Sequence, residues 1–475
     1  MTDETTGKRI VIVGAGPAGM RAAEQLVAAG QRPVVVDEGT RHGGQVYRQP
    51  PAVLQRERRD LYGFETARAS AVLDRFEALR PQIDYRPETL AWQVEASALQ
   101  VLHAGRNSTL PFDALILAPG ATDRVLPFPG WTLPGVYTLG AAQVALKYQG
   151  CLIGPRVVFA GTGPLLYLVA WQYAAHGGQV AAVLDTAPAS AKWLAAPRLL
   201  ARPAVAAKGA YFVARLRMTG VALHGGVTLV KAEGSARVTA LTWRAGGAAN
   251  ASTHTTECDA IGFGHGLRSE TQLADLAGCA FEFSALEQAW LPTCDAAGRS
   301  SVHGVYLAGD GASILGADAA ELSGARAALA AIEDLGLPPA EPEQAAQIER
   351  DLLAHAQFRR GLETAFAPPL RWAAEAPDEL IVCRCEEVTA DELRACVRET
   401  GTREMNRLKA LTRIGMGRCQ GRMCAPAASR LLAHAAGCGL HEVGRWRGEA
   451  PIKPIPIAML HDHVPSTFVP EDQDD

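Results

Sequence analysis

The sequence lacks a strong excess of charge of either sign. Its 475 residues carry 46 Lys and Arg side chains against 50 Asp and Glu, a formal net charge of −4, which excludes a nucleic-acid-binding protein dominated by a basic field. A hydrophobic content of 48% excludes a disordered chain. Cysteine is also scarce, with ten in the chain, and six of the ten lie after residue 375. So uneven a distribution predicts a local site rather than a disulfide framework.

Segments that direct a chain to a membrane are missing as well. Polar residues 1–7 lead directly into the strand-like run 9–13, so we expect no secretory signal. Residues 157–184 contain no Asp, Glu, Lys or Arg, but four glycines divide the stretch, and we interpret it as strand, turn, buried helix and strand. We therefore expect no membrane span, no nucleic-acid partner and a location in the reducing cytoplasm.

A glycine fingerprint follows the first apolar run. It lies between strand-like residues 10–13 and an Ala-rich helical segment, so backbone amides and the positive end of the helix dipole would face an anion. The residues predicted to contact a dinucleotide here are Gly14, Gly16, Pro17, Ala18 and Gly19. Gly14 permits the tight turn, Gly16 lets a pyrophosphate approach, and Gly19 lets helix and strand pack closely. A purely structural Gly-rich turn is the competing interpretation.

Acidic residues and a second glycine pair complete this predicted site. Asp37 ends the strand that follows the helix, where an acid binds adenosine-ribose hydroxyls, and the adjacent Glu38 is the alternative for that role. Gly44 and Gln45 lie in a loop that we expect to pass close to a flavin.

Two later turns indicate which dinucleotide binds. Residues 115–121 and the strand that runs into the Gly-Asp turn at 309–310 resemble the two-dinucleotide-binding-domain flavoproteins, the glutathione reductase-like group. In that group the Asp of the turn bonds the ribityl chain of FAD, and the helix that follows points at the flavin ring. The resemblance implies FAD, a helix start within 319–325, and four further contacts: Ala118, Gly120, Gly309 and Asp310. An ordinary surface strand and turn is the alternative.

A second fingerprint at residues 161–166 lacks its third glycine, because Leu166 stands there. Leu166 is expected to hold helix and strand apart and to change the pocket. Gly161, Gly163 and Asp185 are the predicted contacts of this unit. Two interpretations remain open, a working site for NAD(P) or an adenine nucleotide, and a structural relic.

Four cysteines near the carboxyl terminus have the spacing of a metal centre: Cys383, Cys385, Cys419 and Cys424. Both pairs fall in loops at predicted helix ends, and a capping box of Thr389 and Glu392 starts the first of these helices. Four thiolates suit a 2Fe-2S cluster or a zinc ion. The C-x-C and C-x4-C spacings and a neighbouring flavin favour the cluster over zinc, and free thiols are a third interpretation.

The other cysteines give no further site. Cys396 shares the apolar face of its helix and is interpreted as core, whereas four isolated cysteines are interpreted as buried free thiols: Cys151, Cys258, Cys279 and Cys294. No redox-active pair follows the glycines at 43–44, so disulfide reductase chemistry is disfavoured.

The combination of motifs resembles one enzyme family over nearly the whole chain. The segments that carry the resemblance are residues 14–19, 43–45, 140–143, 161–166, 309–310 and 415–424. They look like the A chain of opine oxidases and the B chain of hydrogen cyanide synthase. The cysteine module is similar to the BFD-like (bacterioferritin-associated-ferredoxin-like) 2Fe-2S domain. The alpha chain of heterotetrameric sarcosine oxidase is a relative without that domain.

The resemblance implies a function as well as a fold. It implies an FAD and 2Fe-2S electron-transfer subunit of an amine, opine or imino-acid dehydrogenase that acts on CH-NH donors. A D-amino-acid-oxidase-like flavoprotein subunit would oxidise the substrate to an imine and pass on the electrons. Two further components are left open, a small ferredoxin-like subunit and an FMN at an interface between subunits. The alternatives are a self-sufficient NAD(P)H-dependent reductase, which Leu166 disfavours, and a structural or regulatory subunit.

The predicted fold is therefore α/β, with two Rossmann-like dinucleotide-binding domains and a small helical BFD-like 2Fe-2S domain. The predicted boundaries are residues 1–125 with 295–340 for a discontinuous FAD-binding domain, 126–294 for the second Rossmann-like domain, 341–380 for a helical linker, 381–440 for the 2Fe-2S domain and 441–475 for a C-terminal tail.

Overall fold

Two parallel five-stranded sheets form the centre of the structure, a computed structural model that describes residues 8–246, 252–338 and 342–457. The strand order in the first sheet is β20-β7-β1-β2-β3. Its strands are β1 (Ile10–Val13), β2 (Val34–Val36), β3 (Asp84–Arg86), β7 (Ala114–Leu117) and β20 (Val305–Leu307). Central strands β1 and β7 are fully buried, as expected for a parallel sheet covered on both faces.

The first sheet joins segments that lie far apart in the chain. Helix α1 (Pro17–Ala28) crosses α9 (Ala317–Asp334) so closely that a Cβ added at Gly324 would lie 1.9 Å from the Ala18 carbonyl oxygen. Helix α9 begins two residues before the predicted start at Ala319. The crossing fixes the Gly-Asp turn that precedes α9 against the glycine fingerprint that precedes α1.

The second sheet repeats this plan with the strand order β12-β11-β10-β16-β9. Its strands are β9 (Val136–Thr138), β10 (Arg156–Thr162), β11 (Gln179–Asp185), β12 (Ala222–Gly225) and β16 (Ala260–His265). The charge-free stretch is strand, turn, helix α5 (Pro164–Ala175) and strand, as predicted. In the described part of the chain, no helix has the length and apolar content to cross a bilayer. Two sheets of this kind confirm the predicted α/β class.

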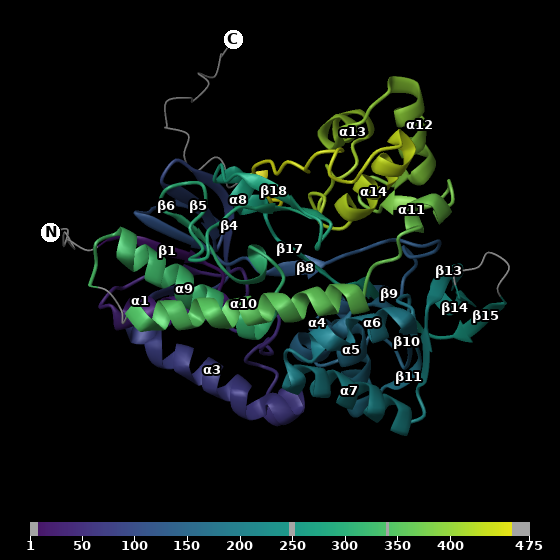
Figure 1. Ribbon diagram of the computed structural model, residues 1–475, viewed down its shortest axis with the longest axis horizontal. Helices are drawn as coiled ribbons and strands as arrows, with labels where there is room; N and C mark the ends of the chain where they lie inside the picture. The colour runs from purple at the N-terminus through teal and green to yellow at the C-terminus, as the bar shows by residue number, and fades with distance from the viewer. Residues whose placement is uncertain (1–7, 247–251, 339–341, 458–475) are drawn as a thin grey trace, which may run out of the picture.

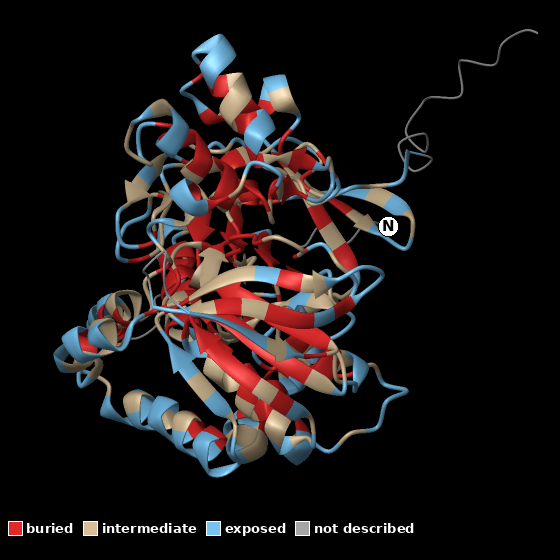
Figure 2. Cartoon of the chain, turned by 90° about the vertical axis from the view of Figure 1, so that its right-hand side faces the viewer, coloured by how far each residue is buried: buried red, intermediate tan, exposed pale blue. Residues whose placement is uncertain are grey.

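Smaller elements connect and cover the two sheets (Figure 1). The antiparallel strands are β4 (Thr89–Glu95), β5 (Ala98–His103), β6 (Arg106–Pro111), β8 (Ala121–Asp123), β13 (Val227–Gly234), β14 (Val238–Ala245), β15 (Thr253–Glu257), β17 (Leu267–Ser269), β18 (Phe281–Ser284) and β19 (Ala289–Pro292). The helices are α2 (Arg58–Tyr62), α3 (Thr66–Leu79), α4 (Leu139–Val144), α6 (Ala189–Leu199), α7 (Pro203–Met218), α8 (Gln272–Leu276), α10 (Pro342–Ala365) and α11 (Trp372–Glu375). Buried residues concentrate on the sheet strands (Figure 2).

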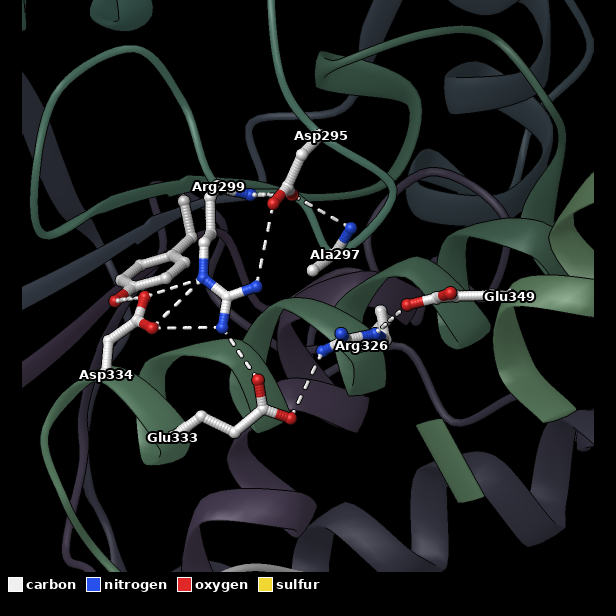
Figure 3. A network of polar contacts seen from close by, with 8 residues as sticks. Asp295, Ala297, Arg299, Arg326, Glu333, Asp334 and Glu349 are labelled. Carbon is white, nitrogen blue, oxygen red and sulfur yellow. Dashed lines mark hydrogen bonds and ion pairs between the residues drawn. The ribbon is translucent and has the colours of Figure 1, made fainter. Parts of the chain in front are cut away.

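An ion-pair network ties the end of α9 to its neighbours (Figure 3). The Arg299 guanidinium bonds Asp334 at 2.8 Å and Glu333 at 2.7 Å. Arg326, also on α9, bonds Glu349 of α10 at 2.7 Å. Helix α10 is therefore attached to the first-sheet unit along its amino-terminal half.

The cysteine module is a small helical unit at the upper right of Figure 1. Its elements are β21 (Ile381–Cys383), β22 (Val388–Thr389), α12 (Ala390–Thr400), α13 (Met405–Thr412) and α14 (Ala425–Ala436). The predicted capping box is confirmed, because Thr389 and Glu392 bond each other's backbone N–H groups, and α12 ends at Gly401. The module packs on the body through the Trp131 indole, which donates to the Ile381 carbonyl at 2.7 Å.

The segment after the module returns to the body. Trp446 lies against the cysteine loop, where a Cβ at Gly415 would be 1.9 Å and one at Gly421 2.7 Å from its ring. Ile452 is buried, and Lys453 pairs with Glu38. The predicted tail therefore acts as a strap as far as Lys453, and its acidic end lies outside the described residues. The predicted domain boundaries stay a prediction.

Candidate functional site

Glycine stands at the three positions of the first fingerprint for different structural reasons. A Cβ at Gly14, whose φ is +99°, would lie 2.3 Å from the Ala118 carbonyl oxygen, and one at Gly19 would lie 1.7 Å from the Gly14 oxygen. Gly16 has an ordinary φ of −79°, and the nearest atom to its added Cβ is the Gly44 Cα at 3.8 Å. Since neither packing nor backbone demands glycine at 16, the residue fits a surface left clear for a pyrophosphate.

The other predicted FAD contacts converge on this fingerprint. Gly44 lies against Gly16, and a Cβ at Gly309 would lie 2.8 Å from the Ala18 Cβ. The turn at 309–311 also touches the loop at 118–120, because a Cβ at Gly311 would be 2.8 Å from the Pro119 ring. Loops from four separate parts of the chain thus meet at the amino terminus of α1.

Asp310 orders the turn before α9. One of its carboxylate oxygens accepts hydrogen bonds from the backbone N–H groups of Leu315 and Gly316, both at 3.0 Å. Burial raises the pKa of the carboxyl, and the two hydrogen bonds oppose that effect. The Ser323 hydroxyl accepts from the Gly309 N–H at 2.9 Å. Three hydrogen bonds within the chain therefore hold the turn, and the ribityl contact of Asp310 stays a prediction.

Asp37 and Glu38 face different surroundings. The two Asp37 carboxylate oxygens accept from the N–H groups of Ala15 and Gly39, each at 2.6 Å. Burial raises the pKa of Asp37, against these two hydrogen bonds. Glu38 points outward and pairs with Lys453 of the strap. Asp37 therefore holds the fingerprint in shape, while the ribose roles of both residues stay predictions.

A buried lysine near this site was missed by the sequence reasoning. Lys147 lies on a π-helical turn, η3 (Ala145–Gln149), and its ammonium donates to the Val46 carbonyl at 2.9 Å, next to the glycine pair at 43–44. Burial lowers the pKa of Lys147 to about 8. Its signal in the sequence is a lone cation among apolar residues just after the 140–143 motif.

The second fingerprint differs from the first in its turn. Gly163, which corresponds to Gly16, has a φ of +120°, so glycine is required there by the backbone itself. A Cβ at Gly161 would lie 1.8 Å from the Gly264 oxygen. Leu166 is fully buried in the core that surrounds α5. The turn therefore differs from that of the first fingerprint, and the effect of Leu166 on the pocket stays a prediction.

The acidic residue of the second unit already has hydrogen-bond partners within the protein. Asp185 is fully buried, and one of its oxygens accepts from the Tyr167 hydroxyl at 2.7 Å and the Lys192 ammonium at 2.6 Å. The Phe366 ring, just after α10, lies 5.5 Å from that ammonium. A ribose role for Asp185 stays a prediction, and these contacts would have to open for it.

The four predicted ligand thiols come together in the module. They contact in a chain from Cys383 to Cys424, from Cys424 to Cys419 and from Cys419 to Cys385. Cys424 precedes α14, Cys383 ends β21, and the other two lie in the loops between. Among the described residues, no group of three or more His, Cys, Asp or Glu side chains is placed to hold a metal ion as it stands. Four thiols that act on one another in this way are the donor set of a 2Fe-2S cluster or a zinc ion.

Backbone groups also point at these sulfurs. Contact with the Cys424 thiol and the N–H groups of Gly415, Glu386 and Cys385 lower the pKa of Cys383 to about 6, although burial opposes them. Gly417 has no room for a side chain, since its Cβ would lie 2.4 Å from the Cys385 Cβ. Thiolates surrounded by N–H donors and close-packed glycines fit an iron-sulfur cluster.

A buried ion pair joins the cysteine loop to the predicted flavin loop. Arg422 bonds Glu270 at 2.7 Å, and its guanidinium also donates to the Cys419 carbonyl at 3.4 Å. The backbone N–H of Glu270 donates to the Gly120 carbonyl at 3.0 Å. A short bonded path therefore connects two residues predicted for different cofactors.

The remaining cysteines follow the predictions only in part. Cys258 and Cys279 are buried, as expected, and Cys396 packs half-buried against the core of its module. Cys151 and Cys294 are exposed, so the prediction of buried thiols is wrong for these two. Cys151 follows Gly150 in a loop after η3, and Cys294 lies just beyond strand β19, so neither belongs to a buried strand or helix.

Two protein-family models match the chain. The model described as pyridine nucleotide-disulphide oxidoreductase matches residues 8–332, and the BFD-like [2Fe-2S] binding domain matches residues 381–434. The second match includes all four clustered cysteines. FAD and a 2Fe-2S cluster are accordingly the cofactors of this chain, and the residues above fit both.

Several known proteins are similar over nearly the whole chain. The A chain of opine oxidase from Rhizobium meliloti is 36% identical over 95% of this chain and 86% of its own length. The HcnB chain of hydrogen cyanide synthase from Pseudomonas aeruginosa is 35% identical over 96% and 98%. The alpha chain of sarcosine oxidase from Rhizobium meliloti (strain 1021) is 26% identical over 92% of this chain and 40% of its own.

A solved structure supports the fold. L-proline dehydrogenase from P. horikoshii superposes with a TM-score of 0.68 at 19% identity, and the match covers 96% of this chain and 79% of that one. The family models and the relatives confirm the resemblance drawn from the motifs. The chain belongs to the pyridine nucleotide-disulphide oxidoreductase family, in the group of the opine oxidase A chains and HcnB, and carries a BFD-like 2Fe-2S domain.

Proposed function

We propose that this chain is the electron-transfer subunit of a multi-subunit amine, opine or imino-acid dehydrogenase. A D-amino-acid-oxidase-like flavoprotein subunit would oxidise the CH-NH substrate, and this chain would carry the electrons through its flavin and its cluster to an acceptor. The names of the relatives support a subunit role, since opine oxidase and hydrogen cyanide synthase are both named as enzymes of more than one chain.

The observation that carries the proposal is the Glu270–Arg422 link. It connects the Gly120 loop to the Cys419 loop by hydrogen bonds of 3.0, 2.7 and 3.4 Å. Bound FAD can accept two electrons together and release them singly, as a one-electron cluster requires. The link holds the two loops at a fixed separation, which is what repeated single-electron transfer needs.

The chain's own residues have positioning roles in this scheme. Gly16 leaves the pyrophosphate surface clear, and Asp37 and Asp310 keep the two turns around it rigid. Gly417 lets the cysteine loop approach Cys385. The two carboxylates are already engaged by backbone N–H groups, and the proposal places substrate oxidation on a partner.

Photoreduction of the flavin in the anaerobic, purified chain tests the proposal. We expect the electron paramagnetic resonance signal of a reduced 2Fe-2S cluster to appear as the flavin is reduced. A cluster that dithionite reduces but the reduced flavin does not would contradict the proposed route. Steady amine turnover by the chain with no other protein added, sensitive to Asp310→Ala, would place the substrate chemistry here instead.

A further inference from the structure

Three arginines where the body meets the cysteine module have no carboxylate partner among the described residues. Arg124, which follows β8, is 5% exposed, and its guanidinium donates to the Glu287 carbonyl oxygen at 3.0 Å. Arg430 of α14 is half-buried and donates to the Gln288 side chain at 2.5 Å. Arg268 of β17 is half-buried, and in the described part of the chain it makes no hydrogen bond or ion pair. Cations taken out of water in this way need an anion nearby.

The three guanidiniums form one group. Burial lowers the pKa of Arg268, and the charge of Arg124 lowers it further. Burial and Arg124 together lower the pKa of Arg430 to about 10. All three still keep their protons at neutral pH. Their neighbour His265 is neutral there, because burial and the two charges of Arg430 and Arg124 lower its pKa to about 3.

The carboxylates near this group are already engaged. Glu270, which acts on Arg268, pairs with Arg422 at 2.7 Å. Glu363, which acts on Arg124, pairs with Arg359 on its own helix. The Glu287 carboxylate accepts from a hydroxyl and a backbone N–H of the segment that follows the Gly-Asp turn. The arginine group therefore keeps uncompensated positive charge.

This charge lies beside the cysteine loop. The Cys424 thiolate acts on the Arg268 guanidinium. The Gln272 side chain, from the helix that follows β17, donates to the Gln420 carbonyl at 2.7 Å, which ties this segment to the loop. Arg430 stands six residues after Cys424, roughly 9 Å along the axis of α14.

We propose that Arg268, assisted by Arg124 and Arg430, raises the reduction potential of the 2Fe-2S cluster. A cluster on four thiolates is anionic, and each electron that it accepts adds one negative charge. A nearby unpaired cation therefore stabilises the reduced form more than the oxidised form. This role rests on the proposed function, since a higher potential favours the passage of one electron from reduced FAD to the cluster, while any proton that the flavin releases goes to water.

Redox titration of the full-length holoprotein with dithionite tests the role of Arg268. Electron paramagnetic resonance follows the cluster, and visible absorbance follows the flavin. Arg268→Met keeps the length of the side chain but removes its charge. It lowers the equilibrium constant for cluster reduction about tenfold, which corresponds to about 59 mV for one electron. Arg268→Lys recovers most of this loss, and Arg430→Gln shifts the constant in the same direction as Arg268→Met.

Arg418→Met is the matched control. It removes the same charge from the residue next to Cys419, but Arg418 is exposed, so water screens its charge and the constant changes less than about twofold. Iron, acid-labile sulfide and FAD contents stay at wild-type values in Arg418→Met and Arg430→Gln, which keeps the test valid if Arg268→Met assembles poorly.

Three outcomes separate this role from the proposed function. Wild-type cluster potentials in both Arg268→Met and Arg430→Gln, or equal shifts in Arg268→Met and Arg418→Met, would overturn the role and leave the electron route intact. A shift of the flavin potential alone would assign Arg268 to the flavin and also overturn it. A wild-type cluster that photoreduced flavin does not reduce would overturn the proposed function instead.

Discussion

The Arg422–Glu270 pair offers a direct test of how the cluster module is fixed to the flavoprotein body. Replacing Arg422 with Ala removes a cation that is 12% exposed from a carboxylate that is 10% exposed. It also removes the hydrogen bond that the guanidinium donates to the Ile452 carbonyl at 2.7 Å, which holds the strap. The substitution therefore releases the module at two points.

The expected loss of folding free energy follows from the burial of the Arg422–Glu270 pair. Breaking a buried ion pair by removing one partner costs about 3–5 kcal/mol, because the other charge is left without compensation. The pair Arg398–Asp391 in the same module is the matched control, since its side chains are 63% and 53% exposed. Arg398→Ala is expected to cost less than about 1 kcal/mol, because water screens the exposed pair.

Urea unfolding of the holoprotein, followed by the visible absorbance of the cluster, measures both effects. Arg422→Ala lowers the midpoint, and Glu270→Ala in the Arg422→Ala background restores part of the loss, since the orphaned carboxylate is gone. In the photoreduction experiment Arg422→Ala also delays the cluster signal. Equal losses in Arg422→Ala and Arg398→Ala, or strict additivity of the two substitutions at 270 and 422, would show that the reasoning is wrong.

Four further predictions concern the cofactor sites. Gly16→Val places side-chain atoms on the pyrophosphate surface, so heat release from the purified variant should yield no FAD. Iron and acid-labile sulfide should be lost in Cys385→Ser and kept in Cys396→Ser, the latter being a core cysteine outside the chain of thiols. NADH and NADPH should bleach the flavin slowly or not at all, since Asp185 is held by Tyr167 and Lys192; rapid stoichiometric bleaching would restore the reductase interpretation. Burial lowers the pKa of Lys147 from 10.5 to about 8, so the folded state loses this proton before the unfolded state does. Stability should therefore rise between pH 8 and 10.5, by roughly 3 kcal/mol in full, and Lys147→Met should flatten that rise in thermal melts.

Features set by neighbouring residues could be predicted from the sequence. The two strand-turn-helix units follow from apolar runs punctuated by glycine, and the capping box at Thr389 and Glu392 needs only residues three apart. The four cysteines predicted as ligands were singled out by their spacing, and the structure brings their thiols together. Each of these signals is local, so no knowledge of the tertiary structure was required.

Features set by contacts across the chain could not be predicted. Asp185 has the position of a ribose-binding acid, yet Lys192 from the following helix and Tyr167 from the preceding one occupy it. Glu270 and Arg422 are 152 residues apart. Arg422 stands in the motif at 415–424, but nothing in that motif pairs it with Glu270. A local pattern shows which residue is suited to a role, but only packing decides whether its polar atoms are already in use.

The glycines of the cysteine loop combine both kinds of information. The motif at residues 415–424 identifies the cysteine loop in the sequence. Within it, Gly417 packs against Cys385, a predicted ligand of the 2Fe-2S cluster, so the cluster site itself accounts for this glycine. Gly415 and Gly421 have a different reason, because Trp446 from the strap lies where their side chains would be. The same strap continues to Lys453, which pairs with Glu38 beside the FAD fingerprint. One segment thus touches the loop of one cofactor and the site of the other, so a change in the docking of the module is transmitted to both.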